Sequence, residues 1–209
     1  DRQLALPDLR FEDTCEKLMY VGFLGWEPNV QGLLWFIENV WPELQSRRPG
    51  LRFDVVGKHA DARLQAAVSA WANISLRGYV ADLQSVYRDS RVSVAPLLFG
   101  SGMKVKVLDA MARGIPTVTT SVGAEGIEVA DGVQLMIADD PADMANRIDR
   151  LLGDRRLWET LQSESRALIQ NRYTWGKLLT AMHGAVDTAW REHRRPALAR
   201  RRHGAAHAG

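Results

Sequence analysis

A glycine-containing loop, Gly100-Ser101-Gly102, separates an expected strand over 92–97 from an expected helix over 103–113. A helix that begins after such a loop directs its free backbone N–H groups and the positive end of its dipole at one place. Glycine lets a ligand approach the backbone closely, and serine is a common helix cap. The arrangement therefore favours binding of an anion such as a phosphate.

Two lysines, Lys104 and Lys106, fall in the first turn or so of the same helix. The helix dipole disfavours a cation there by roughly 0.3–1 kcal/mol, and local conflicts of this kind tend to mark functional positions. A bound anion would turn the repulsion into attraction, whereas the alternative is that both lysines extend into solvent. The loop lacks the third glycine of the dinucleotide fingerprint, because position 105 is Val105, and it is not a Walker A motif.

Short β-branched runs alternate with longer amphipathic stretches along most of the chain. Strands are expected at 18–22, 53–57, 74–76, 92–97, 115–120 and 133–137, and helices at 30–45, 60–70, 81–89, 103–113, 141–152, 154–170 and 174–190. The alternation predicts an α/β fold, a doubly wound Rossmann-like parallel sheet with C-terminal helices. Ligands of such sheets bind beyond the carboxyl ends of the strands, here the loops 22–30, 57–61, 78–82, 97–104 and 121–127.

The composition, with 46% hydrophobic and 25% charged residues, is that of a folded globular protein with a sizeable core. The single cysteine, Cys15, excludes an intrachain disulfide and indicates a reducing, cytoplasmic compartment. We expect no signal peptide and no membrane span, because the longest apolar run, 33–37, is far below the ~20 residues a span needs. No Cys/His cluster has zinc spacing.

The net charge of +2 combines two different regions. Residues 191–209 hold six arginines and one glutamate, or +5, and the other 190 residues hold 21 basic and 24 acidic side chains, or −3. The body is therefore not a nucleic-acid binder on charge grounds. We expect the 191–209 tail to be disordered, and it is either a solvated end or a contact with anionic lipid at the inner membrane face.

Several stretches resemble family-4 retaining glycosyltransferases in order and spacing. They are the signature 102–118 (Gly-Met-Lys-Val-Lys-Val-Leu-Asp-Ala-Met-Ala-Arg-Gly-Ile-Pro-Thr-Val), 121–127 (Ser-Val-Gly-Ala-Glu-Gly-Ile), the domain opening 21–29, 53–57 and 78–83. The resemblance covers 17–190, between a lead-in at 1–16 and the tail at 191–209. It implies the C-terminal, donor-binding domain of a GT-B glycosyltransferase, which transfers sugar from a UDP or GDP sugar to a glycan or lipid-linked acceptor, with retention, as in polysaccharide biosynthesis.

The resemblance also implies roles for single residues. The diphosphate would lie on Gly100, Ser101, Gly102 and Met103, with Lys104 and Lys106 as the catalytic cations that stabilise its departure, without a metal ion or other cofactor. Asp109 would accept from the ribose hydroxyls. Tyr79 and Val80 would flank the base, the loops at Gly25 and Lys58 would close on phosphates and sugar, and Glu125 would contact the donor sugar. Nonfunctional alternatives are packing for Tyr79, helix capping for Glu125, a surface pair with Lys106 for Asp109, and solvation for Lys58.

Three departures from the family pattern bear on activity. The family has two glutamates eight positions apart, where this chain has Ser101 and Asp109, and many relatives carry a phosphate-binding lysine at the place of Asn29. Only about 16 residues precede the first expected strand, so we expect this chain to lack the acceptor domain. We expect donor binding with weak transfer unless a separate acceptor-domain chain assists. The alternatives are a non-catalytic nucleotide-sugar-binding or regulatory subunit, a truncated fragment, and a nucleotide-sugar epimerase.

Overall fold

The computed structural model describes residues 2–5 and 9–204. The chain divides into a compact unit, Arg2–Ile169, and a second unit that contains Gln170–Gly209. We describe each unit by itself.

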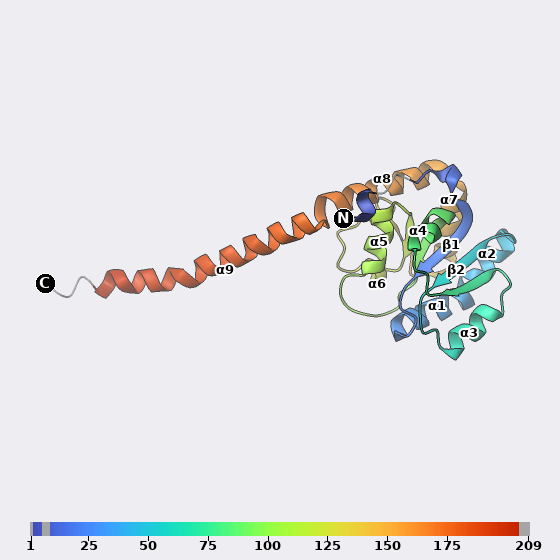
Figure 1. Cartoon of the computed structure of the whole chain (residues 1–209), viewed down its shortest axis with the longest axis horizontal. Helices are drawn as coiled ribbons and strands as arrows, with labels where there is room; N and C mark the ends of the chain where they lie inside the picture. Colours follow the sequence, from blue (N-terminus) through green and yellow to red (C-terminus); the bar gives the residue numbers. More distant parts are fainter. Residues whose placement is uncertain (1, 6–8, 205–209) are drawn as a thin grey trace. The chain divides into compact units, whose positions relative to one another are not determined.

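The compact unit is built on one sheet of six parallel strands (Figure 1). The strands are β1 Cys15–Val21, β2 Arg52–Val56, β3 Ile74–Gly78, β4 Ser90–Ala95, β5 Thr117–Thr119 and β6 Met136–Ile137. Their order in the sheet is β3-β2-β1-β4-β5-β6. From β1 the sheet extends through β2 to β3 on one side and through β4 and β5 to β6 on the other. The direction of strand order therefore reverses between the central neighbours β1 and β4. This confirms the predicted doubly wound α/β fold.

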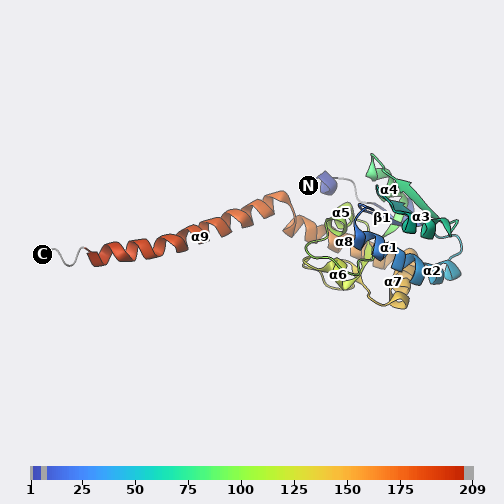
Figure 2. The same cartoon turned by 90° about the horizontal axis from the view of Figure 1, so that it is seen from below.

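Helices cover both faces of the sheet (Figures 1 and 2). They are α1 Glu27–Asn39, α2 Trp41–Arg47, α3 Ala62–Ser69, α4 Leu83–Asp89, α5 Val105–Arg113, α6 Ser121–Ala124, α7 Pro141–Gly153 and α8 Arg155–Arg172, with short 3-10 turns η1 Arg2–Ala5 and η2 Phe11–Asp13. The single helix expected at 30–45 is two helices. Pro42 lies in the first turn of α2, and proline interrupts a helix because it lacks the N–H that would bond the preceding turn.

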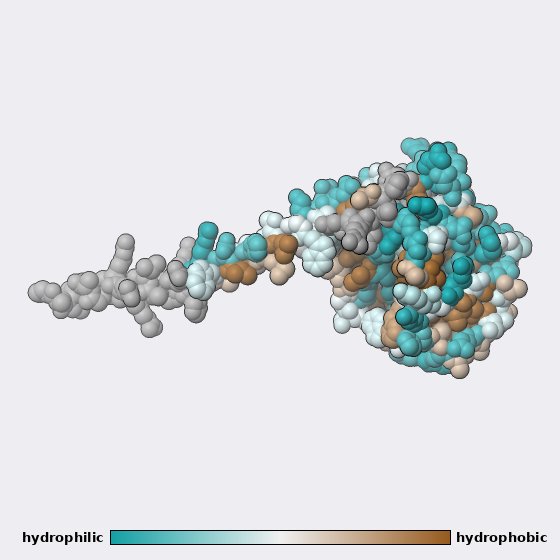
Figure 3. Space-filling model, in the orientation of Figure 1, coloured by the Kyte–Doolittle hydropathy of each residue, from teal (hydrophilic) through white to brown (hydrophobic). Residues whose placement is uncertain are grey.

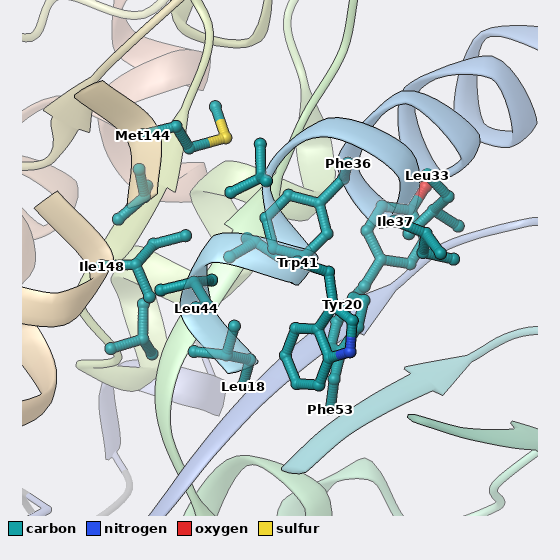
Figure 4. Packing of buried hydrophobic residues seen from close by; sticks show 14 of the residues in the cluster. Leu18, Tyr20, Leu33, Phe36, Ile37, Trp41, Leu44, Phe53, Met144 and Ile148 are labelled. Atoms are coloured by element: carbon teal, nitrogen blue, oxygen red, sulfur yellow. The ribbon is translucent and has the colours of Figure 1, made fainter. Parts of the chain in front are cut away.

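The two faces of β1 belong to different parts of the core. Leu18 and Tyr20 pack with α1, α2 and α7, as Figure 4 shows for the larger cluster. Met19, between them in sequence, packs on the opposite side with residues of α4 and α5. Because successive strand side chains point to opposite faces, a strand covered on both sides is apolar throughout. The visible face of the unit carries hydrophilic residues around scattered apolar patches (Figure 3).

One glycine allows a close approach that positions the ends of the central strands. A Cβ built on Gly32 of α1 would lie 1.9 Å from the carbonyl oxygen of Pro96, just after β4. Helix α1 therefore rests directly on the backbone of the loop that follows β4. This contact brings the chain segment after β1 and the segment after β4 into one region.

The second unit contains the end of α8 and helix α9, Trp175–Gly204. The backbone thus stays helical from 191 to 204, where the sequence analysis expected disorder, because Ala and Arg, frequent there, are strong helix formers. Residues 205–209 of the expected tail lie outside the described residues. Among the described residues, no helix is both long and apolar enough to cross a bilayer.

Candidate functional site

The loops after β1 and β4 meet at the point where strand order reverses. In open parallel sheets, the crevice beyond the carboxyl ends at such a switch point is the usual ligand site. Here the first loop is 22–26, and the second runs from Pro96 to Lys104 before α5 begins. The loop 100–102, which the sequence predicts to bind phosphate, therefore lies where ligands bind in folds of this type.

The glycine loop leaves a row of backbone amides open. Gly100 and Gly102 have φ values of +123° and +78°, which other residues rarely adopt. Within the described residues, no amide of 100–106 donates a hydrogen bond to a protein acceptor. Helix α5 has no side-chain cap, its cap position is Lys104, and exposed Ser101 does not provide the expected capping bond. An uncapped helix start of this kind is suited to an anion.

Lys104 does not extend into solvent. Its side chain is buried at 5% exposure, and its Nζ donates to the carbonyl oxygens of Gly100 at 3.0 Å and Gly102 at 2.6 Å. The same nitrogen lies 3.6 Å from the carboxylate of exposed Glu125, in the loop after α6. The lysine therefore points inward, into its own loop.

Lys106 lies in the crevice between the two loops. Its Nζ donates to the phenol oxygen of Tyr20 on β1 at 3.0 Å and to the side-chain oxygen of Asn29 on α1. Asn29 is buried and in turn donates to the carbonyl oxygen of Phe23 at 2.7 Å. Burial, and second the charge of Lys104, lower the pKa of Lys106 to about 8. A desolvated ammonium whose hydrogen-bond partners are a phenol and an amide oxygen is well placed to attract an anion.

A pocket of about 250 Å³ lies at the carboxyl ends of β1, β2 and β3. It is lined by Val21, Gly22, Phe23, Val56, Gly57, Lys58, Gly78, Tyr79, Val80 and Leu83. The Nζ of Lys58 lies 4.0 Å from the centre of the Tyr79 ring, a cation–π distance. The structure therefore brings Lys58, Tyr79 and Val80 together in one pocket.

Gly25 adjoins this pocket without lining it. A Cβ on Gly25 would come within 2.8 Å of the Phe23 ring and 3.2 Å of the Cβ of His59. The loops after β1 and β2 are thus in close contact. Met103, after the glycine loop, is half-exposed and lies close to Gly126, whose added Cβ would be 3.5 Å from its backbone.

Asp109 faces α4 and does not line the pocket. One carboxylate oxygen accepts from the phenol of Tyr87 at 2.9 Å and from Nε of Arg113 at 3.0 Å. Arg113 also donates to Gln84. Burial, followed by the charge of Asp109, raises the pKa of Tyr87. The cation that pairs with Asp109 is Arg113 at i+4, whereas the sequence analysis had considered Lys106.

The sequence analysis missed two contacts of the site, Tyr20 and the amide of Asn29. Tyr20 was treated only as a strand residue, and Asn29 only as the place of an absent lysine. Their separation from Lys106, 86 and 77 residues along the chain, leaves no local signal. Within the described residues, no cluster of His, Cys, Asp or Glu could hold a metal ion.

A doubly wound sheet with an open amide loop at its switch point is the arrangement of Rossmann-like nucleotide-binding domains. The sequence model described as glycosyl transferases group 1 matches residues 15–154, and the chain belongs to this family. An uncharacterized 44.6 kDa protein in the cps region of Klebsiella pneumoniae is 31% identical over 138 residues, which are 63% of this chain and 36% of that protein.

Solved glycosyltransferase structures of the GT-B type share the fold. S. aureus TarM has a TM-score of 0.71 at 16% identity, over 86% of this chain and 36% of TarM. Anabaena HepE, solved with UDP and glucose, has 0.70 at 15% identity, over 85% of this chain and 49% of HepE. The C-terminal domain of LpcC, a glycosyl transferase group 1 family protein of Francisella tularensis, has 0.63 at 18%, over 83% and 92%. The chain thus spans about half or less of the full-length relatives.

Proposed function

We propose that this chain is the donor-binding part of a glycosyltransferase and binds a nucleoside diphosphate sugar beyond the carboxyl ends of β1 and β4. The observation that carries the proposal is the set of open amides at 100–106 beside the ammonium of Lys106. Amides and a desolvated cation at a helix start attract a diphosphate. The similar TarM and HepE proteins were solved in complex with UDP, which supports a uridine nucleotide before a guanosine one.

The pocket at Tyr79 supports the placement of the base. It is mainly apolar, includes Gly22 and Phe23 of the loop after β1, and presents the exposed aromatic ring of Tyr79. Base stacking on an aromatic side chain contributes about 1–3 kcal/mol in single-stranded nucleic-acid complexes. The ribose would then extend toward Asp109, where the carboxylate already accepts from Tyr87 and Arg113.

For the reaction, the amides and Lys106 would stabilise the charge of the departing nucleoside diphosphate, an electrostatic role that needs no metal ion. Retention of configuration and membership of family 4 follow only from the sequence resemblance. The acceptor, a glycan or a lipid-linked glycan, would be held by the remainder of a longer protein or by a separate chain. The relative from a cps region supports a role in polysaccharide biosynthesis. The proposed place of action, the cytoplasm or the inner membrane face, rests on the sequence alone.

Exposed apolar side chains around the crevice support a covering partner. They are Phe23 and Trp26 after β1, and Leu98, Phe99, Met103 and Val105 after β4. A contiguous apolar rim is typical of a surface that another protein part covers. A nucleotide sugar bound at the open amides would then lie between this domain and the acceptor-binding part.

Isothermal titration calorimetry tests the proposal with UDP, GDP, their glucose and mannose conjugates and inorganic pyrophosphate. We expect saturable binding of at least one nucleotide sugar, and Lys106→Gln should weaken it about tenfold or more, since a charged hydrogen bond contributes about 1.5–3 kcal/mol. Arg156→Gln, at an exposed position of α8, is the matched control and should change nothing. Absence of binding to every nucleotide and to pyrophosphate would refute the proposal.

A second titration separates base from phosphate. Tyr79→Ala should weaken UDP binding about tenfold and leave pyrophosphate binding unchanged, because only the nucleotide carries a base to stack. Val133→Ala, another exposed apolar position, is the control. An equal loss of affinity for UDP and pyrophosphate would show that the base does not stack on Tyr79.

A further inference from the structure

The two lysines of the Gly-Met-Lys-Val-Lys segment have different surroundings. Lys104 is buried at 5% exposure, while Lys106 is partly exposed in the crevice. A lysine ammonium has three donors. For Lys104, two of them reach the carbonyls of Gly100 and Gly102, and the third side of the ammonium faces Glu125. Two of the three hydrogens of Lys104 are therefore donated within its own loop, and its charge is paired with Glu125.

The loop around Lys104 is shaped by these bonds. The two accepting carbonyls belong to positions four and two residues before the lysine, and both have the positive φ that glycine allows. The loop 100–104 thus wraps around the side chain of Lys104. Without the ammonium, the carbonyl oxygens of Gly100 and Gly102 would lose their shared donor, and the loop would lose the two bonds that hold its shape.

Glu125 connects this loop to a second one. Its carboxylate lies 3.6 Å from Lys104, and its own side chain is 59% exposed. The loops after β4 and after α6 are therefore joined at Lys104. Glu125 contacts Lys104 in the structure, whereas its contact with the donor sugar stays a prediction.

We propose that Lys104 is a positioning residue, which binds the carbonyls of the loop 100–104 and so keeps the open backbone amides of this loop accessible. Of the two lysines, Lys106 is the one that contacts the anionic ligand. The assignment of Lys106 rests on the proposed function, and the positioning role of Lys104 does not. That positioning role replaces the catalytic role that the sequence analysis assigned to Lys104. The charge of Lys104 still acts on the site through its proximity to Lys106, whose pKa it lowers.

Hydrogen–deuterium exchange of the ligand-free protein tests the positioning role. Lys104→Gln should raise exchange about tenfold in peptides that cover 105–110, where the amides of Val107 and Leu108 donate to the carbonyl oxygen of Lys104. Lys106→Gln should leave those peptides as in the parent. Lys104→Arg, which keeps a cation with several donors, should restore part of the protection. Unchanged exchange in Lys104→Gln would overturn the proposal.

Glu125→Gln keeps the test decisive if Lys104→Gln does not fold. It leaves the lysine in place and weakens only the link to the second loop. Exchange should then rise in peptides covering 105–110 and 120–126 together. No change in either segment would overturn the role of Lys104 in joining the loops.

Titration with UDP-glucose, or with whichever nucleotide sugar binds, distinguishes the two lysines by their pH profile. Lys104→Gln should weaken binding yet keep a decline above pH 8 that belongs to Lys106, with its midpoint shifted upward because a neighbouring positive charge is gone. Lys106→Gln should abolish that decline. The reverse pattern would overturn the assignment. If the parent protein binds no nucleotide and no pyrophosphate, the proposed function fails, while the exchange experiment still decides the role of Lys104.

Discussion

The ammonium of Lys106 lies 3.0 Å from the phenol oxygen of Tyr20, a strand residue only 1% exposed. This contact joins the start of α5 to the end of β1 across the switch point of the sheet. Tyr20 also belongs to the core cluster beneath α1. The position of the cation is therefore determined by the hydrophobic core.

Binding of a nucleotide sugar should weaken as pH rises through about 8. The pKa of Lys106 is lowered to about 8, so the free protein loses this positive charge above that pH. A bound diphosphate raises the pKa of the lysine, and binding above pH 8 must then take up a proton. We expect affinity for UDP-glucose, whose own diphosphate does not titrate there, to fall up to tenfold per pH unit between pH 8 and 10.

Calorimetry across this pH range provides the measurement, and Lys106→Arg provides the control. Arginine stays charged at these pH values, so the variant should bind with a flat profile. A flat profile in the parent protein would exclude Lys106 from ligand binding.

Lys106→Met should make the ligand-free protein more stable at pH 7. The folded pKa lies below the ordinary value of 10.5, so the unfolded chain binds more protons between pH 8 and 10.5. Stability therefore rises with pH across that window and is lowest below pH 8, where the buried lysine must be charged. Removal of the charge should raise the free energy of unfolding by about 1–2 kcal/mol, once the loss of the lysine's hydrogen bonds is subtracted.

Urea unfolding at pH 7 and pH 10 measures this effect. The stabilisation should be present at pH 7 and shrink toward pH 10, with the Arg156→Gln variant equal to the parent at both. Destabilisation at pH 7 would mean that the bonds to Tyr20 and Asn29 outweigh the burial of the charge.

Gly32→Ala should destabilise the protein and weaken nucleotide binding together. A Cβ at position 32 would lie 1.9 Å from the carbonyl oxygen of Pro96, which belongs to the backbone and cannot turn away. Helix α1 would have to move from the loop after β4, and overpacking of this kind costs typically 1–3 kcal/mol. Thermal unfolding and UDP titration provide the measurement.

Gly50→Ala is the matched control for this substitution. A Cβ at position 50 meets nothing within 4 Å, so both stability and binding should stay near the parent. If Gly32→Ala behaved like Gly50→Ala, the close approach of α1 to the loop after β4 would be wrong.

Asp109→Asn should weaken binding of UDP by about tenfold and leave binding of 2′,3′-dideoxyuridine diphosphate unchanged. The proposed contact joins the carboxylate to the ribose hydroxyls. The substitution in the protein and the removal of the hydroxyls from the ligand delete the same interaction, so their effects on binding free energy should not add. Tyr87→Phe is the comparison, because it removes one donor to Asp109 and keeps the carboxylate. Equal losses with both nucleotides would assign Asp109 to the fold alone.

The sequence by itself determined the parallel sheet and the place of the ligand loop. Apolar runs at 18–22, 53–57 and 92–97 predict buried strands, and the ends of β1, β2 and β4 lie within three residues of them. Gly114, the residue that follows the expected helix 103–113, ends α5 with a φ of +76°. These features are local, since strand, helix and turn preferences act over a few neighbouring residues.

Only the tertiary structure decided what the charged side chains of the site do. The sequence places Lys104 and Lys106 two positions apart and assigns them one role, yet one binds its own loop and the other reaches Tyr20 and Asn29. Those partners are brought together by strand order and by the contact of α1 with the loop after β4. A side chain's direction depends on such packing between distant segments, which spacing along the chain does not encode.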